Sequence, residues 1–397
     1  MMRVLYITLE NLSLHKGSVV HVKEVIDGLK KRGHQVGLIG SAWTKLENPD
    51  HFYNIHPNKL ALFKYFSIKK KSYFISSLLL FLYLFKILRQ YDTIYARDFH
   101  TVIIALIPRV LFNKKLVFEI NGLASEEQRL KNHSPLNSIL AAAIQKAEKI
   151  ATKYSDRIVS VTPQIATYLT QYFHCQPDKV KVIGNGVNTK RFHPIYDETS
   201  LWIERKRLGI TKEDIVIVFV GNLAPWQGVN ILIESAFQLL VNNENLKFLI
   251  VGEGFLRDFL EKRVSDSKYE KKFIFTGMIQ YEDIPVLINL ADICVAPFIS
   301  RRNRTTGVSP IKVFEYMACG KPVVSSRIEG LEFIEEEGAG CLIEPEDVTG
   351  LEKALYDLIK DLQKRMGMGQ KGLQIARERF RWESMVIKIE EVLKGLA

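Results

Sequence analysis

The chain has 397 residues, of which 47% are hydrophobic and 25% are charged. This balance excludes a disordered or fibrous chain, and the length predicts two domains, each with a core of its own. The formal net charge of +11 favours an anionic partner. Without a zinc-finger, RNP or helix-turn-helix motif, nucleic acid is a weaker candidate than anionic lipid or a nucleotide substrate.

The cysteines and the N-terminus indicate the compartment. Cys175, Cys294, Cys319 and Cys341 lie far apart and form no CxxC pair, which predicts neither a metal knuckle nor a disulfide framework. The chain enters a strand-like run at residues 4–8 with no basic and apolar leader before it. These features predict a cytoplasmic protein without a signal peptide.

Short β-branched runs alternate with longer amphipathic segments along the chain. The first expected strands are residues 4–8, 36–39, 93–95, 116–119, 157–161 and 180–183. After a turn-rich break at 184–199, the pattern restarts at 215–220, 247–251, 273–275, 293–296, 322–325 and 341–343. Buried parallel strands covered by helices have this pattern, so the predicted fold class is α/β, with two doubly wound Rossmann-like domains. The expected domains are residues 1–190 and 191–379, followed by a C-terminal helix at 380–397.

One uncharged run, residues 72–85, lies between Lys69–Lys71 and Lys86. A bilayer span needs about 20 apolar residues, so the run is too short to cross a membrane. Two interpretations remain open. The run forms a helix buried against the first sheet, or its outer face also rests on an anionic membrane surface, such as the inner face of the plasma membrane.

Residues 309–324 carry the strongest local signal for chemistry. They predict a helix with Ser309 as N-cap and Pro310 at the first position, stopped by Gly320. A helix N-terminus suits a phosphate, and a bound diphosphate would explain a cation, Lys312, in the first turn. Glu315, one turn on, can accept two hydrogen bonds from a ribose. A capped surface helix with an unrelated lysine explains the residues alone equally well.

This segment is one of several motifs, in matching order, that resemble glycosyltransferase family 4 over nearly the whole chain. The others are residues 17–22, 29–36, 185–188, 191–194, 251–254, 275–277 and 381–383. The resemblance implies a GT-B fold, in which an N-terminal acceptor domain and a C-terminal nucleotide-sugar domain face across a cleft. It implies that the C-terminal helix packs back on the N-terminal domain. It also implies retaining transfer from a nucleotide-diphosphate sugar, with the leaving phosphate taking the acceptor's proton.

The sequence departs from the family pattern at three positions. The family's E-x7-E motif ends on Glu315, but its first glutamate is Gly307 here. The arginine and lysine that usually hold the donor diphosphate are Asn222 and Gln227. A diphosphate still needs charged partners when it leaves water.

We expect Lys312 and an arginine from the run 301–304 to take over this role. The resulting donor-binding set is Gly17, Gly254, Gly277, Met278, Arg304, Ser309, Ile311, Lys312 and Glu315. Two alternatives stay open: a nucleotide-sugar 2-epimerase on the same fold, and a non-catalytic partner subunit that has lost these groups.

Polar residues also follow two strands of the N-terminal half, where parallel sheets bind ligands. Arg97 and His100 follow the strand at 93–95, and Asn121 follows the strand at 116–119, where the family often has a sugar-contacting histidine. With Lys312 they are the catalytic candidates, although a role as cap or turn former is favoured for His100 and for Glu126. No Asp-x-Asp occurs, so neither a metal site nor a cofactor is predicted. The expected substrates are a UDP- or GDP-sugar and a glycan or lipid-linked acceptor in cell-surface polysaccharide biosynthesis.

Overall fold

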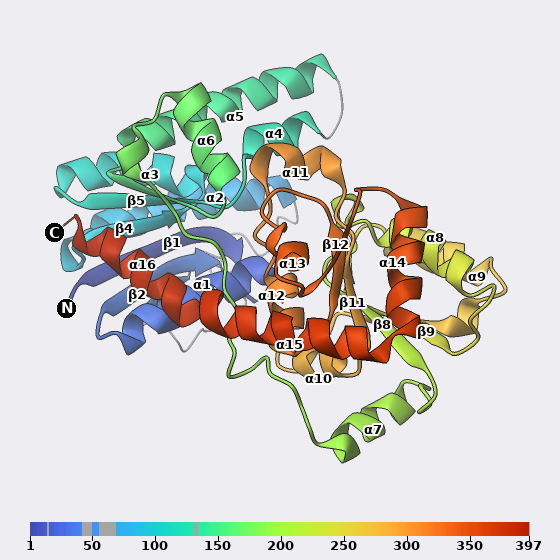
Figure 1. The fold of residues 1–397 in the computed structure, drawn as a ribbon. Coiled ribbons are helices and arrows are strands. Elements are labelled where there is room, and N and C mark those ends of the chain that lie inside the picture. Colours follow the sequence, from blue (N-terminus) through green and yellow to red (C-terminus); the bar gives the residue numbers. More distant parts are fainter. Residues whose placement is uncertain (14–15, 42–49, 55–68, 131–133, 397) are drawn as a thin grey trace. The chain divides into compact units, whose positions relative to one another are not determined.

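The computed structural model describes residues 1–13, 16–41, 50–54, 69–130 and 134–396 (Figure 1). The chain forms two compact units. Unit 1 comprises Met1–Asn185 and Trp382–Ala397, and unit 2 comprises Gly186–Arg381. The chain therefore passes between the units twice, after Asn185 and before Trp382.

Unit 1 is built on a seven-stranded parallel sheet with the order β3-β2-β1-β4-β5-β6-β7. Its strands are β1 (Arg3–Asn11), β2 (Gln35–Ser41), β3 (His51–Asn54), β4 (Thr93–Arg97), β5 (Lys115–Ile120), β6 (Arg157–Ser160) and β7 (Val180–Val182). Six of them match the expected runs. The short edge strand β3 was not predicted, because His51–Asn54 lacks an apolar run and pairs only through tertiary structure with β2.

Helices cover both faces of this sheet. They are α1 (Gly17–Lys31), α2 (Lys69–Ile87), α3 (Phe99–Leu111), α4 (Ala124–Arg129), α5 (Pro135–Tyr154), α6 (Pro163–Phe173) and α16 (Trp382–Lys394), with short turns η3 (Leu88–Gln90) and η4 (Pro177–Lys179). Helices α2, α3 and α5 contribute buried side chains to one core on the sheet, and α1 packs on β1 and β2. Helix α16 packs against α1 so closely that a Cβ on Gly28 would lie 2.4 Å from Val386 Cγ2 (Figure 1).

Helix α2 contains the uncharged run. Its Leu80 and Leu84 are fully buried against the sheet, which confirms the interpretation as a buried helix. On its outer side, Leu78 and Leu82 are about half exposed. The side chains of Lys69–Lys71 lie outside the described residues. Among the helices that the structure describes, none combines the length and apolar content that a bilayer crossing needs.

Unit 2 has a six-stranded parallel sheet with the order β10-β9-β8-β11-β12-β13. Its strands, all close to the predicted runs, are β8 (Ile215–Val220), β9 (Leu246–Val251), β10 (Phe273–Gly277), β11 (Ile293–Ala296), β12 (Val323–Ser326) and β13 (Gly340–Ile343). Its helices are α7 (Glu198–Arg207), α8 (Val229–Leu239), α9 (Arg257–Ser265), α10 (Ile284–Asn289), α11 (Ser300–Thr306), α12 (Ile311–Ala318), α13 (Phe333–Glu336), α14 (Val348–Lys360) and α15 (Leu362–Arg379), with η5 (Pro225–Gln227) and η6 (Glu270–Lys272).

In each sheet, successive strands are first added toward one edge and then, from one point on, toward the opposite edge. In unit 1 this point lies between β1 and β4, and in unit 2 between β8 and β11. Ligands of doubly wound sheets bind beyond the carboxyl ends of the strands at such switch points. The polar residues that follow β4, β8 and β11 therefore lie where such a sheet binds its ligand.

Candidate active site

Helix α12 begins one residue later than the sequence predicts. Pro310 takes the N-cap position with φ −85° and ψ 109°, and no side chain caps the helix, so the prediction of Ser309 as N-cap is wrong. The cause is the extended backbone of Pro310, which excludes it from the first helical turn. The predicted stop is confirmed, because Gly320 follows the helix with a φ of +69°. The Tyr316 hydroxyl accepts a hydrogen bond of 2.7 Å from the Val220 N–H, which ties α12 to the end of β8.

Lys312 lies in the first turn of α12 and points back over the end of β8. Its Nζ donates to Gln227 Oε1 at 2.7 Å and lies 4.0 Å from the centre of the Phe219 ring. A Cβ on Gly221 would lie 2.5 Å from Nζ, so this lysine position requires glycine at 221. Burial lowers the pKa of Lys312 to about 7, although the Glu315 carboxylate opposes the shift.

Glu315 is one turn further along the same helix. Its side chain is on the same face as Lys312, as residues three apart are, and the residue is only 4% exposed. The Tyr281 hydroxyl donates to Glu315 Oε1 at 2.8 Å. The helix thus brings together a cation, a carboxylate and an uncapped N-terminus.

Loops at the carboxyl ends of β8 and β9 approach each other closely. The Leu223 N–H donates to the Glu253 carbonyl at 2.8 Å, and a Cβ on Gly254 would lie 2.3 Å from Asn222 Oδ1. Gly277, at the end of β10, has a φ of +71°, and the next residue, Met278, is half exposed. The predicted residues Gly254 and Gly277 therefore have a structural requirement for glycine, since these loops leave no room or backbone freedom for another residue.

The basic run lies on α11, which packs against η5, the turn that contains the Lys312 partner Gln227. Arg304 is exposed, and among the described residues no contact joins it to Lys312. Gly307 ends α11 with φ 60° and ψ −169°, a conformation that residues with a side chain rarely adopt. A glutamate at this position would be strained, which is a physical reason for the departure from the E-x7-E pattern. Ile311, the first residue of α12, is half-buried.

In unit 1, a buried polar cluster lies at the carboxyl ends of β4 and β5. Its centre is Glu119, which is fully buried. Arg97 Nε and Asn121 Nδ2 donate to Glu119 Oε1 at 3.2 and 2.7 Å, and His21 Nε2 lies 3.0 Å from Oε2. The predicted residues Arg97 and Asn121 are therefore brought together by a carboxylate that was not predicted as a site residue.

Both oxygens of Glu119 are fully engaged. Burial raises the pKa of its carboxyl, but the charges of His21 and Arg97 and the hydrogen bonds from His21 and Asn121 outweigh burial and lower the pKa to about 2. Arg97 also donates to the Ser18 carbonyl at 3.2 Å, in the first turn of α1. The carboxylate is therefore ionised at any physiological pH.

His21 connects this cluster to both chain crossings. Its Nδ1 lies 2.7 Å from Asn185 Oδ1, in the last residue before the chain enters unit 2. Its ring meets the ring of Trp382 edge-on at 5.2 Å, at the point where the chain returns. His21 and Glu119 could have been noticed in the sequence, because each is a polar residue within an otherwise apolar segment. Their pairing could not, because the two residues are 98 positions apart and meet only in the folded protein.

The structure does not bring His100 to this cluster. Its side chain is 54% exposed in the first turn of α3, 3.7 Å from Asp98, whose carboxylate accepts from the Thr101 N–H to cap the helix. Glu126 accepts from the Tyr168 hydroxyl at 3.0 Å, a packing contact between α4 and α6. Gly17 is the exposed first residue of α1.

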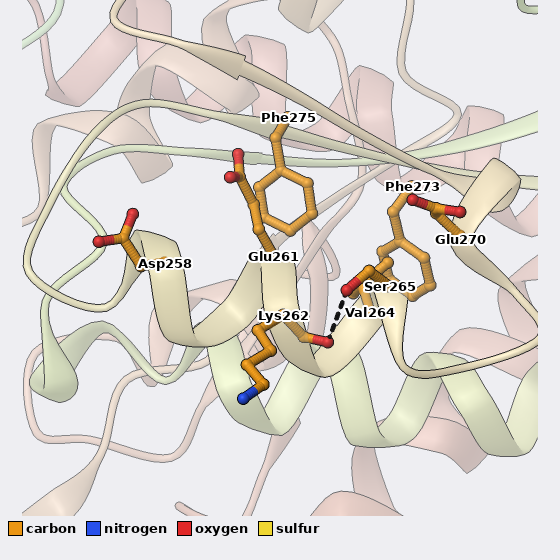
Figure 2. A pocket seen from close by; sticks show the side chains of 8 residues that line it. All are labelled: Asp258, Glu261, Lys262, Val264, Ser265, Glu270, Phe273 and Phe275. Carbon is orange, nitrogen blue, oxygen red and sulfur yellow. Dashed lines mark hydrogen bonds between the residues drawn. The ribbon is translucent and has the colours of Figure 1, made fainter.

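Figure 2 shows a pocket of unit 2 that lies elsewhere, along α9, η6 and β10. Its volume is about 530 Å³, and its charged lining residues are Asp258, Glu261, Glu270 and Lys262. Three carboxylates against one ammonium would repel a diphosphate, so this pocket does not suit the donor. No group of three or more His, Cys, Asp and Glu side chains within the described ranges is arranged to hold a metal ion.

Two doubly wound parallel units, joined by two chain crossings, form a GT-B fold. The family model "Glycosyltransferase Family 4" matches residues 15–191, and "Glycosyl transferases group 1" matches residues 201–374. The chain belongs to glycosyltransferase family 4.

Individual proteins agree with this assignment. An uncharacterized glycosyltransferase of Methanocaldococcus jannaschii is 25% identical over 95% of this chain and 94% of its own length. A GDP-mannose-dependent monoacylated alpha-(1-6)-phosphatidylinositol monomannoside mannosyltransferase of Corynebacterium glutamicum is 28% identical over 65% of this chain and 67% of its own. Anabaena HepE, solved in complex with UDP-glucose, superposes with a TM-score of 0.76 and 19% identity over the full length of both chains.

Proposed function

We propose that the protein is a retaining, metal-independent glycosyltransferase that moves a hexose from a UDP- or GDP-sugar to a glycan or lipid-linked acceptor in cell-surface polysaccharide biosynthesis. The observation that carries the proposal is the spacing on α12, where a partly buried cation and a buried carboxylate share one helix face next to an uncapped N-terminus. The UDP-sugar complex of HepE and the GDP-mannose and glycolipid in the mannosyltransferase's name support the substrate classes.

The donor's diphosphate and its ribose would be bound by two side chains one turn apart on α12. Lys312 supplies the positive charge, and the backbone N–H groups at the start of α12 would supply directed donors for phosphate oxygens. Glu315 accepts hydrogen bonds from the ribose hydroxyls. Lys312 thus takes the place of the cations that are absent at Asn222 and Gln227, while Gln227 orients the ammonium.

Unit 1 would contact the sugar and the acceptor. In a retaining transfer the leaving phosphate can take the acceptor's proton, so no separate base is required of this chain. Asn121 and Arg97 stand at the switch-point edge of the sheet. We assign Asn121 to sugar contact and Arg97, which is buried and bonded to Glu119, to holding this site in place. His100 is left out of this assignment because it faces solvent.

We extend the proposal to a lipid-linked acceptor at an anionic leaflet. Exposed apolar side chains lie on neighbouring α2 and α3, among them Leu82, Ile107, Val110 and Leu111, and Lys86 is exposed beside them. Basic residues near an anionic surface contribute about 1 kcal/mol each, and apolar side chains add a part that salt does not remove. Sedimentation with phosphatidylglycerol-containing vesicles but not with phosphatidylcholine vesicles, and weaker binding of Val110→Glu, would support the extension. Equal, negligible binding to both vesicle types at low salt would refute it.

A panel of UDP-, GDP- and TDP-sugars tests the core of the proposal. A bound donor raises the unfolding temperature by mass action, and product analysis of the stabilising donor then reports transfer. Release of free nucleotide with an epimerised sugar and no acceptor would favour a 2-epimerase instead. Tight binding without any turnover would favour a non-catalytic partner subunit.

A further inference from the structure

The exposed end of the buried cluster in unit 1 is the side-chain amide of Asn121. An amide offers either two N–H donors or a carbonyl acceptor, depending on which way it is turned. The two orientations cannot be told apart by shape, so the neighbours must decide. For Asn121 the deciding neighbour is Glu119, which lies 2.7 Å away.

The chemistry of Glu119 allows only one orientation. Its carboxylate accepts from Arg97 Nε and faces His21 Nε2, and the whole residue is inaccessible to solvent. An ionised carboxylate has no proton to donate, so the Asn121 atom next to it must be the NH2 group. The opposite orientation would bring two oxygens together in a buried site.

The carbonyl oxygen of Asn121 is left without a protein donor. Within the described residues, the bond to Glu119 is the one hydrogen bond of this side chain, and the residue is half-buried rather than enclosed. The oxygen is thus available to a ligand, and it can only accept.

We infer that Glu119 is a positioning residue that turns the Asn121 amide so that its carbonyl oxygen receives a hydrogen bond from one hydroxyl of the transferred sugar. The inference rests on the proposed function and makes it more specific, because the site then requires a hydrogen-bond donor on the sugar at one position. His21 and Arg97 act further back by holding Glu119 in place. A fluorine substituent can occupy the place of that hydroxyl, but it has no proton and cannot donate the hydrogen bond to Asn121.

The experiment uses UDP-glucose or GDP-mannose, whichever the full-length protein turns over, with monodeoxy and monodeoxyfluoro analogues at each sugar hydroxyl. For the unmodified protein we expect one position at which both analogues lower kcat/KM about tenfold or more, the loss of one well-placed hydrogen bond. For Glu119→Met no acceptor remains next to the Asn121 amide, so the amide is no longer held in one orientation, and we expect the penalty at that position to shrink below threefold. Binding of UDP or GDP alone should stay within twofold, because unit 2 is unchanged.

Asn121→Asp is a second test that keeps Glu119, Arg97 and His21 as they are. It keeps an acceptor oxygen but cannot donate to Glu119, so we expect it to lose turnover about as strongly as Asn121→Ala. Asn121→His, which can donate through one ring nitrogen and accept through the other, should retain more activity than either. If Asn121→Asp is as active as the unmodified protein, or if Glu119→Met keeps the full hydroxyl penalty, Glu119 does not position Asn121. An active enzyme with no position sensitive to both analogues would overturn the inference and leave the proposed function standing, whereas failure to use any donor would count against the proposed function itself.

Discussion

Each unit has an ionic side chain withdrawn from solvent at the carboxyl ends of its central strands, Glu119 fully buried and Lys312 partly buried, but the two units compensate the charge differently. In unit 1, Glu119 has donors on both oxygens, and its pKa falls to about 2. In unit 2, Lys312 has a neutral amide and an aromatic ring as neighbours, no described residue forms a salt bridge with it, and its pKa falls to about 7. A buried charge that is paired within the protein holds neighbouring side chains in place. A buried charge that the protein leaves unpaired is suited to an ionic ligand.

The largest effect should come from breaking the paired cluster. Glu119→Leu leaves Arg97 and His21 buried without their carboxylate, and removal of one partner of a buried ion pair costs about 3–5 kcal/mol. We expect the urea midpoint of unfolding to fall accordingly. The matched control is Glu234→Ala, which removes a partly exposed bidentate pair with Arg263 and should cost less than about 1 kcal/mol. Equal midpoints for the two variants would contradict the account of unit 1.

Glu315→Ala should produce the next largest effect, on activity rather than folding. Loss of charge-assisted hydrogen bonds to the ribose is worth about 2–4 kcal/mol, or roughly a 30- to 1,000-fold drop in kcat/KM for the donor. Tyr281→Phe is the control, because it removes the hydroxyl bonded to Glu315 and keeps the carboxylate. It should change kcat/KM by less than about fivefold. A Glu315→Ala enzyme with unchanged kcat/KM would show that the ribose binds elsewhere.

Lys312→Met should weaken ligand binding without loss of stability, the opposite of the effect expected for Glu119→Leu. The substitution removes an unpaired buried charge, so the unliganded protein should not be destabilised, while UDP or GDP binding should weaken about 10- to 100-fold. Calorimetry with the nucleoside provides the control, since the lysine is proposed to contact only phosphate. Equal weakening for nucleotide and nucleoside would mean that the helix has moved.

The same lysine predicts a pH dependence. Its pKa is about 7 in the folded protein and 10.5 when unperturbed, so between these pH values the unfolded chain binds a proton that the folded chain does not. The free energy of unfolding should therefore gain a contribution that rises with pH from 7 to 10.5, and Lys312→Met should lose it. Affinity for a nucleotide sugar should be greatest well below pH 7 and fall as the pH rises through 7, because the charged form binds phosphate. A nucleotide sugar has no phosphate group that titrates in this range, so an affinity unchanged from pH 7 to 9 would contradict the assignment.

The smallest expected effect is that of a chelator. If fixed groups of unit 2 neutralise the diphosphate, EDTA should leave turnover within about twofold of the untreated enzyme. Inactivation by EDTA with recovery on adding Mg²⁺ or Mn²⁺ would show that Lys312 does not complete the charge balance.

The sequence by itself determined the parts that depend on local pattern. The two strand series, the C-terminal helix and the stop at Gly320 follow from apolar periodicity and turn chemistry within a few residues. The Lys312–Glu315 pair was predictable for the same reason, because a spacing of three places two side chains on one helix face. Such features need no knowledge of what packs against them.

Only the tertiary structure decided which polar residues meet. Glu119 joins His21 across 98 positions and Arg97 across 22, and Lys312 meets Gln227 across 85. The same structure separates His100 from Arg97, three positions away in the sequence, because α3 turns it to solvent. Strand β3 also depends on its neighbour, since four residues of mixed polarity become a strand only when β2 offers its edge. Hydrogen-bond partners and sheet edges are set by strand order and crossover direction, and residue spacing along the chain carries no record of either.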